Sequence, residues 1–167
     1  MVEIRDAAPS EMSVVGEIRV TAYEVGGFIS AGSAYAPTLH SLGADGNGLV
    51  LVAIEAQQVL GTIMLQTWPH TGPVVAGSQE AEIRALAVRP ELQGMGIGRT
   101  LLRHALERAA ELGVRHLVLC TEPAMRVAHR LYEQAGFVRL PERDWSPSPD
   151  TRLFVYGLNL DANAQRT

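Results

Sequence analysis

Residues 88–102, VRPELQGMGIGRTLL, place glycines at three alternate positions, Gly94, Gly96 and Gly98. Each glycine adds backbone entropy that folding must remove, so such a cluster indicates a place that requires backbone without side chains. The stretch follows a strand-like run and precedes a helix-like one. Because N–H groups converge at a helix N-terminus and the helix dipole favours negative charge, the pattern predicts a site for a phosphate or pyrophosphate.

Spacing excludes two common phosphate-binding motifs. A dinucleotide fingerprint, G-x-G-x-x-G, would need a third glycine where Arg99 or Leu101 stands. A P-loop needs a lysine, but all 14 Lys and Arg side chains of this chain are arginine. The lack of lysine also excludes a Schiff-base mechanism on this chain.

The elements around the glycines alternate between strand and helix. Apolar periodicity predicts an α/β domain with at least one parallel crossover, from residues 81–88 to residues 116–120. Further strands are expected at 2–5, on both sides of a turn at 56–58, and in FVRL and TRLFVYGLNL, separated by a loop, PERDWSPSPD. Helices are expected at 10–23, near 34–42, after the glycines up to Gly113, and from Thr121-Glu122-Pro123 onward. We expect one domain over residues 1–160 and a frayed tail over 161–167.

Composition narrows the class of protein further. With 47% apolar and 19% charged residues, the chain is typical of a globular domain, and its net charge of −4 disfavours nucleic acid as a partner. The apolar runs are too short to span a bilayer, and the first residues lack the apolar segment of a secretory signal. One cysteine permits no intramolecular disulfide. A cytoplasmic, bacterial protein without membrane contact is therefore expected.

The glycine stretch resembles a known signature. Residues 93–98, QGMGIG, match the Q/R-x-x-G-x-G/A motif of the GNAT superfamily of N-acetyltransferases, and residues 128–137, AHRLYEQAGF, resemble its second motif, A-x-x-x-Y-x-x-x-G-F. The resemblance covers about residues 80–140. It implies a mixed, mostly antiparallel sheet of six to seven strands, splayed between the central strands and flanked by about four helices.

The resemblance also implies the donor and its site. Acetyl-CoA would lie in the gap of the splayed sheet, with no metal required. Its pantetheine arm would bond to the backbone of Leu86, Ala87 and Val88. Its pyrophosphate would bind the loop formed by Gln93, Gly94, Met95, Gly96, Ile97, Gly98, Arg99 and Thr100. Met125 departs from the family pattern, because many members have an asparagine there that holds the pantetheine.

Three residues are the candidates for catalysis under this resemblance. Glu82 would be the base that deprotonates the amine, and the N–H of Leu86 would polarise the thioester carbonyl. Glu80, two residues earlier on the same face, is the alternative base, and a water relay is also open. Tyr132 would protonate the thiolate of the leaving CoA and would contact the cofactor. Glu82 and Tyr132 also have simpler interpretations: Glu82 as a solvated strand residue and Tyr132 as a core residue.

Cysteine and histidine are not expected to act. Cys120 ends a buried strand and is expected to act as a small apolar residue. His116 lies about 13 Å from it along the strand, at ~3.3 Å per residue, which is too far to activate the thiol. The histidines lack the spacing of a metal site within a helix. His70 is the one most suited to face a substrate.

The acceptor is expected to be a primary amine of a small molecule or a peptide. Three loops, residues 23–48, 68–79 and 141–150, would hold it, with a homodimer left open. The candidate contacts are Tyr23, Phe28, Tyr35, Trp68, His70 and Trp145. The expected function is direct acetyl transfer to this amine. A non-catalytic acyl-CoA sensor of the same fold and a regulator binding another nucleotide are the alternatives.

Overall fold

The computed structural model describes residues 1–161, so the predicted tail lies almost entirely outside the described residues. Over this range the strands hydrogen-bond in the order β1-β2-β3-β4-β5-β8-β6, and β7 pairs with β8. The strands are β1 (Glu3–Asp6), β2 (Leu49–Glu55), β3 (Gln58–Thr67), β4 (Glu80–Val88), β5 (His116–Thr121), β6 (Val138–Arg139), β7 (Trp145–Ser148) and β8 (Thr151–Asn159). The helices are α1 (Met12–Val25), α2 (Ala36–Ser41), α3 (Ile97–Glu111) and α4 (Arg126–Gln134). Short 3-10 turns occur at Pro9–Glu11, Pro90–Leu92 and Pro141–Arg143.

The predicted fold class is confirmed. β4 and β5 are parallel, whereas β1/β2, β2/β3, β5/β8, β6/β8 and β7/β8 are antiparallel. The eight strands of the described part exceed the expected six to seven because β7 forms within the stretch that was predicted to be a loop. There Trp145 pairs with Leu153, and Ser148 with Thr151.

The start of α4 was predicted wrongly. Thr121-Glu122-Pro123 was expected to open the helix, but α4 begins at Arg126 and Thr121 is the last residue of β5. The strand continues because Thr121 pairs with Phe154 of β8. A turn follows, in which the N–H of Met125 donates to the carbonyl of Glu122 at 3.0 Å. Strand pairing here overrides the local preference of proline for a first helical position.

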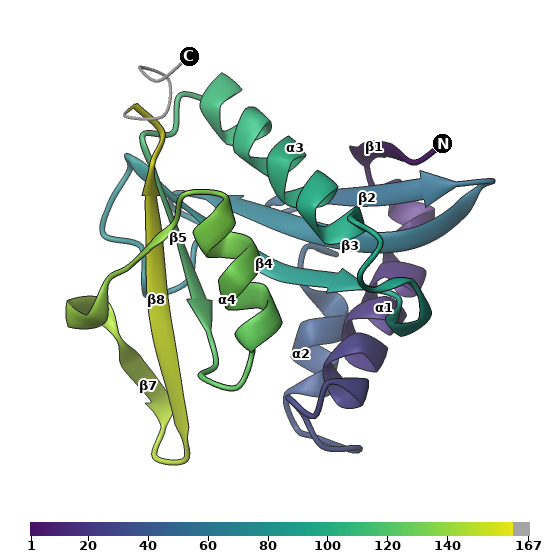
Figure 1. Ribbon diagram of the computed structural model, residues 1–167, viewed down its shortest axis with the longest axis horizontal. Helices are drawn as coiled ribbons and strands as arrows, with labels where there is room; N and C mark the ends of the chain where they lie inside the picture. Colours follow the sequence, from purple (N-terminus) through teal and green to yellow (C-terminus); the bar gives the residue numbers. More distant parts are fainter. Residues whose placement is uncertain (162–167) are drawn as a thin grey trace. The chain divides into compact units, whose positions relative to one another are not determined.

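The chain divides into two compact units, residues 1–65 with 85–105, and residues 66–84 with 106–167. In the first unit, α1 and α2 lie side by side (Figure 1), and the fully buried Arg19 of α1 donates to the carbonyls of Leu39 and Leu42 at 3.3 and 2.6 Å. A single domain over 1–160 stays a prediction.

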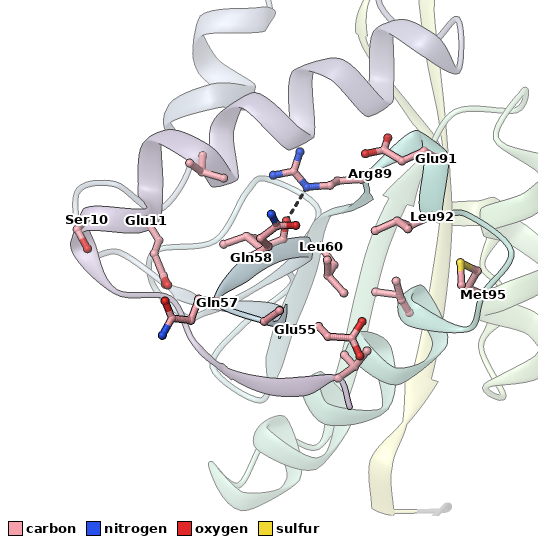
Figure 2. A pocket seen from close by; sticks show the side chains of 15 residues that line it. Ser10, Glu11, Glu55, Gln57, Gln58, Leu60, Arg89, Glu91, Leu92 and Met95 are labelled. Atoms are coloured by element: carbon pink, nitrogen blue, oxygen red, sulfur yellow. Dashed lines mark hydrogen bonds between the residues drawn. The ribbon is translucent and has the colours of Figure 1, made fainter.

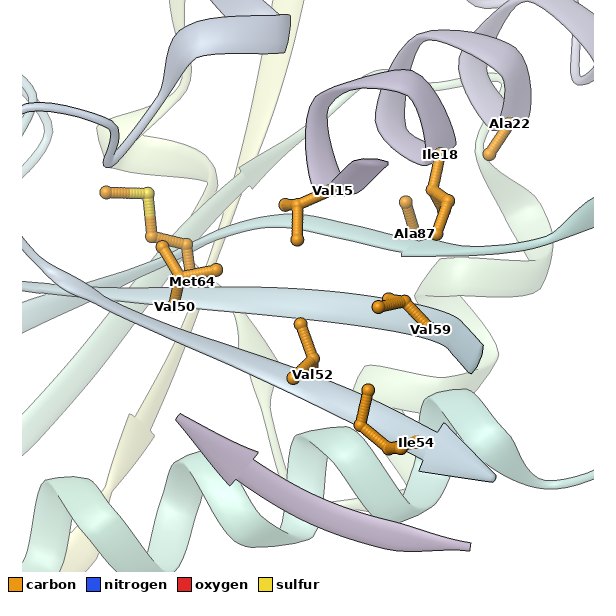
Figure 3. Packing of buried hydrophobic residues seen from close by; sticks show 9 residues of the cluster. All are labelled: Val15, Ile18, Ala22, Val50, Val52, Ile54, Val59, Met64 and Ala87. Atoms are coloured by element: carbon orange, nitrogen blue, oxygen red, sulfur yellow. The ribbon is translucent and has the colours of Figure 1, made fainter. Parts of the chain in front are cut away.

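The core of the first unit joins α1 to the hairpin of β2 and β3. The spacing of apolar residues along α1 turns Val15, Ile18 and Ala22 toward this core, as Figure 3 shows. The hairpin turns at Ala56 and Gln57, which have φ of 49° and 64°. Two consecutive residues with positive φ are typical of the tight turns that match strand twist. The cluster consists of Val15, Ile18, Ala22, Val50, Val52, Ile54, Val59, Met64 and Ala87.

The second unit has a smaller core that includes a loop. Val74 and Val75 lie outside the strands and helices, yet they are buried against Val118 of β5 and Val155 of β8. In Figure 1, β8 runs beside β5, with which it pairs from His116 to Thr121. Val74 and Val75 therefore anchor the loop between β3 and β4 to the core of the second unit.

Candidate active site

The glycine loop has the conformation that bare backbone permits. Gly94 and Gly96 have φ of 83° and 85°, in the left-handed region that favours glycine. Among the described residues, no heavy atom lies within 4 Å of a Cβ added at either position. The two glycines are thus required by backbone conformation and not by crowding from the protein. Gly98 lies in the first turn of α3.

The start of α3 supplies N–H groups for an anion. The N–H of Thr100 donates to the carbonyl of Gly96 at 3.1 Å, which is the first helical hydrogen bond. Helix geometry leaves the N–H groups before it, such as those of Ile97 and Gly98, without an acceptor inside the helix. The exposed, open loop and these donors fit a pyrophosphate group.

β4 changes character along its length. Its parallel ladder with β5 runs, within the described residues, from Glu80 and His116 to Ile83 and Leu119 and ends there. Two residues later Ala85 has φ of 52°, rare for a residue with a Cβ. The unusual φ of Ala85 interrupts the regular alternation of side-chain direction along β4 between Glu82 and Leu86. Such irregularities in strands often occur beside active sites.

Glu82 is a buried carboxylate with a defined orientation. Its residue is 5% exposed, and the N–H of Gly72 donates to its Oε1 at 2.9 Å. Burial raises the pKa of Glu82, because the charged form loses solvation, while Arg84 and the Gly72 N–H oppose the rise. A carboxylate with a raised pKa is better matched to proton transfer near neutral pH than a solvated one. The simpler interpretation, a solvated strand residue, is wrong.

Glu80 has the opposite environment. Arg143 donates to both of its carboxylate oxygens at 2.9 and 2.8 Å, His116 Nδ1 lies 2.6 Å from Oε2, and the N–H of Ala76 donates to Oε1 at 2.8 Å. Chiefly through the hydrogen bonds from Arg143, the pKa of Glu80 falls to about 2. Such a carboxylate holds a proton poorly, so the contacts favour Glu82 over Glu80 as the base.

Cys120 is a half-buried thiol near Glu82. The indole N–H of Trp145 donates to its Sγ at 3.3 Å, and burial raises the pKa of the thiol to about 11. A thiol with such a pKa is protonated at neutral pH, which argues against a nucleophilic role. Trp145, a predicted acceptor contact, is half-buried and directs its indole N–H to this sulfur.

Tyr132 lies on α4 within an aromatic group. It is buried, and its ring centroid lies 5.8 Å from that of Phe137 and 6.3 Å from that of Tyr156. Tyr132 is therefore a core residue, as its apolar stripe predicts. Its role toward CoA stays a prediction. Met125, just before α4, accepts a hydrogen bond at its sulfur from Thr121 Oγ1 at 3.5 Å, and so is occupied within the protein.

The other predicted acceptor contacts fall into two sets. In the first unit, Tyr23 and Phe28 pack edge to face with ring centroids 6.3 Å apart, and Tyr35 is exposed. In the second unit, Trp68 and His70 are exposed on the loop between β3 and β4. The role of the six residues in acceptor binding stays a prediction.

A cavity of about 860 Å³ in the first unit was not predicted from the sequence. Its walls come from the 3-10 turn before α1, the β2–β3 turn and the turn after β4, as Figure 2 shows. Arg89 bridges two of these walls, because its Nε donates to the carbonyl of Val59 at 2.6 Å. Carboxylates of Glu11, Glu55 and Glu91 line the same space. Met95 also lines it, so the cavity adjoins the glycine loop.

Residues 1–161 contain no group of three His, Cys, Asp or Glu side chains placed to hold a metal ion. No helix in this range has the length and apolar character needed to cross a membrane.

Comparison with known proteins agrees with the glycine loop and the sheet. The model of the acetyltransferase (GNAT) family matches residues 17–137, well over half of the chain. This chain is therefore a member of the GNAT acetyltransferase family. The predicted resemblance is thereby confirmed, and it extends well beyond the two motifs on which it was based.

Individual relatives and solved structures share only a low sequence identity with this chain. The chain is 32% identical over 90 residues to a mycothiol acetyltransferase from Geodermatophilus obscurus, covering 53% of this chain but only 28% of that protein. A GNAT acetyltransferase structure from Staphylococcus aureus has a TM-score of 0.76 at 20% identity, covering 96% of this chain and 99% of that one. The PaiA N-acetyltransferase of Thermoplasma acidophilum, in complex with coenzyme A, has a TM-score of 0.73 at 18% identity, covering 95% and 99%. At these identities the structures show the shared fold.

Proposed function

We propose that this protein is an acetyl-CoA-dependent N-acetyltransferase that moves the acetyl group directly to a primary amine of a small molecule or a peptide. The observation that carries the proposal is Glu82, a buried carboxylate with a raised pKa. Burying a carboxylate is costly for folding, and active sites are where such costs are commonly found. Family membership and a structural neighbour that holds coenzyme A support the choice of donor.

On the donor side, the chain's role is to bind and orient. The glycine loop and the N-terminus of α3 hold the pyrophosphate through backbone N–H groups from about Gly94 to Arg99, with Gln93 and Thr100 beside them. The backbone of Leu86, Ala87 and Val88 holds the pantetheine arm, and the N–H of Leu86 stabilises the negative charge that develops on the carbonyl oxygen.

On the acceptor side, Glu82 accepts the proton that the amine must lose. The amine nitrogen then forms a bond to the acetyl carbon while the carbon–sulfur bond breaks and its electron pair leaves with sulfur. Tyr132 donates a proton to that thiolate. The products are the acetylated amine and the free thiol of CoA, so atoms and charges balance without an oxidant or a metal.

A covalent route through Cys120 is less well supported. Burial raises the pKa of its thiol to about 11 against the opposing hydrogen bond from Trp145, and this disfavours the thiolate that such a route needs. The non-catalytic sensor remains the alternative, and it predicts binding of acetyl-CoA without release of thiol. We further propose that the protein acts in the cytoplasm of a bacterium.

The test combines an acceptor panel with one substitution. Release of free thiol from acetyl-CoA is measured against small amines and peptides with free amino groups, and the reactive class is confirmed by mass spectrometry. With a reactive amine, Glu82→Gln is expected to lower kcat by about 10² to 10⁴-fold, the range for general acid–base groups. Calorimetry should show unchanged affinity for acetyl-CoA.

Three results would contradict parts of this proposal. Binding of acetyl-CoA with no thiol release from any amine would favour the sensor. No binding at all would overturn the assignment of the donor. Full turnover by Glu82→Gln would leave the reaction intact and remove Glu82 from its role as base.

A further inference from the structure

The loop between β3 and β4 touches both carboxylates of β4. Gly72 contacts Glu82 and Ala76 contacts Glu80, each through a backbone N–H. Glu80 and Glu82 are two residues apart on one strand and so share a face. One loop therefore reaches a carboxylate with a lowered pKa and another with a raised pKa.

Gly72 is required to be glycine by its close approach to Glu82 and not by its backbone conformation. A Cβ added there would lie 2.9 Å from Oε1 of Glu82, 3.5 Å from Oε2 and 3.6 Å from Cδ. A separation of 2.9 Å is shorter than real Cβ contacts allow, so an added Cβ would displace the carboxylate at the end of the Glu82 side chain. Its φ lies outside the left-handed region, which leaves close approach as the requirement for glycine.

Arg143 fastens this loop from another part of the chain. Besides its two bonds to Glu80, its guanidinium donates to the carbonyl of Val74. The turn between these points is closed by the N–H of Val75, which donates to the carbonyl of Gly72 at 3.4 Å. A planar guanidinium can make these bonds at once, whereas the ammonium of a lysine cannot reproduce the fork.

We propose that Gly72 is a positioning residue for Glu82, and that Arg143 holds the loop that carries it. The inference rests on the proposed function, in which Glu82 is the base. The Gly72 N–H fixes Oε1 and stabilises the charged carboxylate, which leaves Oε2 to accept the proton. The same loop belongs to the predicted acceptor region, so the base and that wall of the acceptor region are set by one segment.

Other charges near Glu82 are also defined. Arg84 follows on β4 and lowers the pKa of Glu82. The Cys120 thiol on β5 is close enough for Glu82 to raise its pKa, and it is protonated at neutral pH. Arg143 is paired with Glu80, which His116 also contacts. Within residues 1–161, the N–H of Gly72 thus donates the only hydrogen bond to the carboxylate of Glu82.

The first measurement needs no substrate. The carboxyl carbon of Glu82 is followed by NMR in protein labelled at glutamate carboxyls, and its resonance is identified by its absence in Glu82→Gln. Gly72→Ala is expected to shift the titration midpoint upward, because the charged form loses its hydrogen bond. Gly77→Ala is the matched control: it lies in the same loop, with no heavy atom of the described chain within 4 Å of the added Cβ.

The second measurement is kinetic. Gly72→Ala should lower kcat by about 100-fold, a common effect of displacing a catalytic group by about 1 Å, with the affinity for acetyl-CoA unchanged. The acid limb of the pH profile should move upward together with the NMR midpoint. In the Glu82→Gln background, Gly72→Ala should have little further effect on kcat, because both changes act on one group.

Arg143→Lys tests the inference if Gly72→Ala fails to fold. It retains the positive charge and loses the fork, so the midpoint of Glu82 should again rise and kcat should fall. Equal midpoints in the wild type, Gly72→Ala and Arg143→Lys would overturn the positioning role even if Glu82→Gln is inactive. A shifted midpoint in a protein without turnover would instead retain the contact and reject the proposed function.

Discussion

The glycine loop, residues 93–98, and the loop around Gly72 use glycine for opposite reasons. Gly94 and Gly96 have left-handed backbone and open surroundings, with no atom of the described chain near an added Cβ. Gly72 has ordinary backbone and a carboxylate 2.9 Å from an added Cβ. The first loop is shaped to leave room for something outside the chain, whereas the second is shaped around the chain's own Glu82. A glycine can thus be required by backbone conformation or by a close internal contact, and φ distinguishes the two.

The largest expected effect lies in the first loop. Gly96→Val places a branched side chain at φ of 85°, so the loop must change its conformation and its N–H groups lose their alignment. Loss of two hydrogen bonds to a charged group, at ~1.5 kcal/mol each or more, corresponds to about 100-fold weaker binding of acetyl-CoA. Isothermal titration calorimetry measures this affinity.

Gly46→Val is the matched control for this substitution. Gly46 also has left-handed backbone, with φ of 82°, and an added Cβ meets no heavy atom of residues 1–161 within 4 Å. It should lose similar stability to Gly96→Val and retain full affinity for acetyl-CoA. Equal affinities in the two variants would mean that the loop at 93–98 does not bind the donor.

The loop around Gly72 contacts both carboxylates of β4, Glu80 and Glu82, and their environments predict opposite effects on stability. Glu80 has a pKa of about 2 instead of 4.5, so its contribution to stability is present above pH 4.5 and is lost as the pH falls toward 2. Glu80→Gln should therefore lower the free energy of unfolding by about 2 kcal/mol at neutral pH, where hydrogen bonds to a charged group are lost. The difference from the wild type should shrink in acid.

Glu82→Gln should have the opposite sign in the same experiment. Because the pKa of Glu82 is raised, the folded state favours its protonated form, and this stabilisation is complete below 4.5 and lost as the pH rises through the folded value. A neutral glutamine should therefore make the protein more stable than the wild type at neutral pH. Urea unfolding of the three proteins between pH 3 and pH 8, at roughly unit intervals, measures both effects. Equal signs at neutral pH would contradict the two environments described for these residues.

The same contrast explains what the sequence could predict. The glycine loop depends on neighbours in sequence, namely a strand before it and the start of α3 after it, and both were recognised from apolar periodicity. The environment of Glu82 depends on Gly72 and Arg143, which lie 10 and 61 residues away in the chain. No periodic pattern marks a single N–H or a single guanidinium, so the loop around Gly72 was expected only as a loop. The start of α4 failed for a similar reason, since pairing of Thr121 with β8 is a contact over 33 residues.

The smallest effect concerns Tyr132, which has a role in both descriptions. Its motif implies an acid near the sulfur of CoA, and its contacts place it in a buried aromatic group with Phe137 and Tyr156. Tyr132→Phe keeps the ring and removes only the hydroxyl, so the aromatic contacts and most of the stability should remain. If the hydroxyl protonates the leaving thiolate, kcat should fall by about tenfold, equivalent to ~1.4 kcal/mol of transition-state stabilisation.

Thiol release under saturating acetyl-CoA measures kcat, and a thermal melt checks the fold. An unchanged kcat with an unchanged melt would assign Tyr132 to packing alone, and a melt lowered without loss of kcat would do the same. A fall in kcat at constant stability separates the chemistry of the hydroxyl from the packing of the ring.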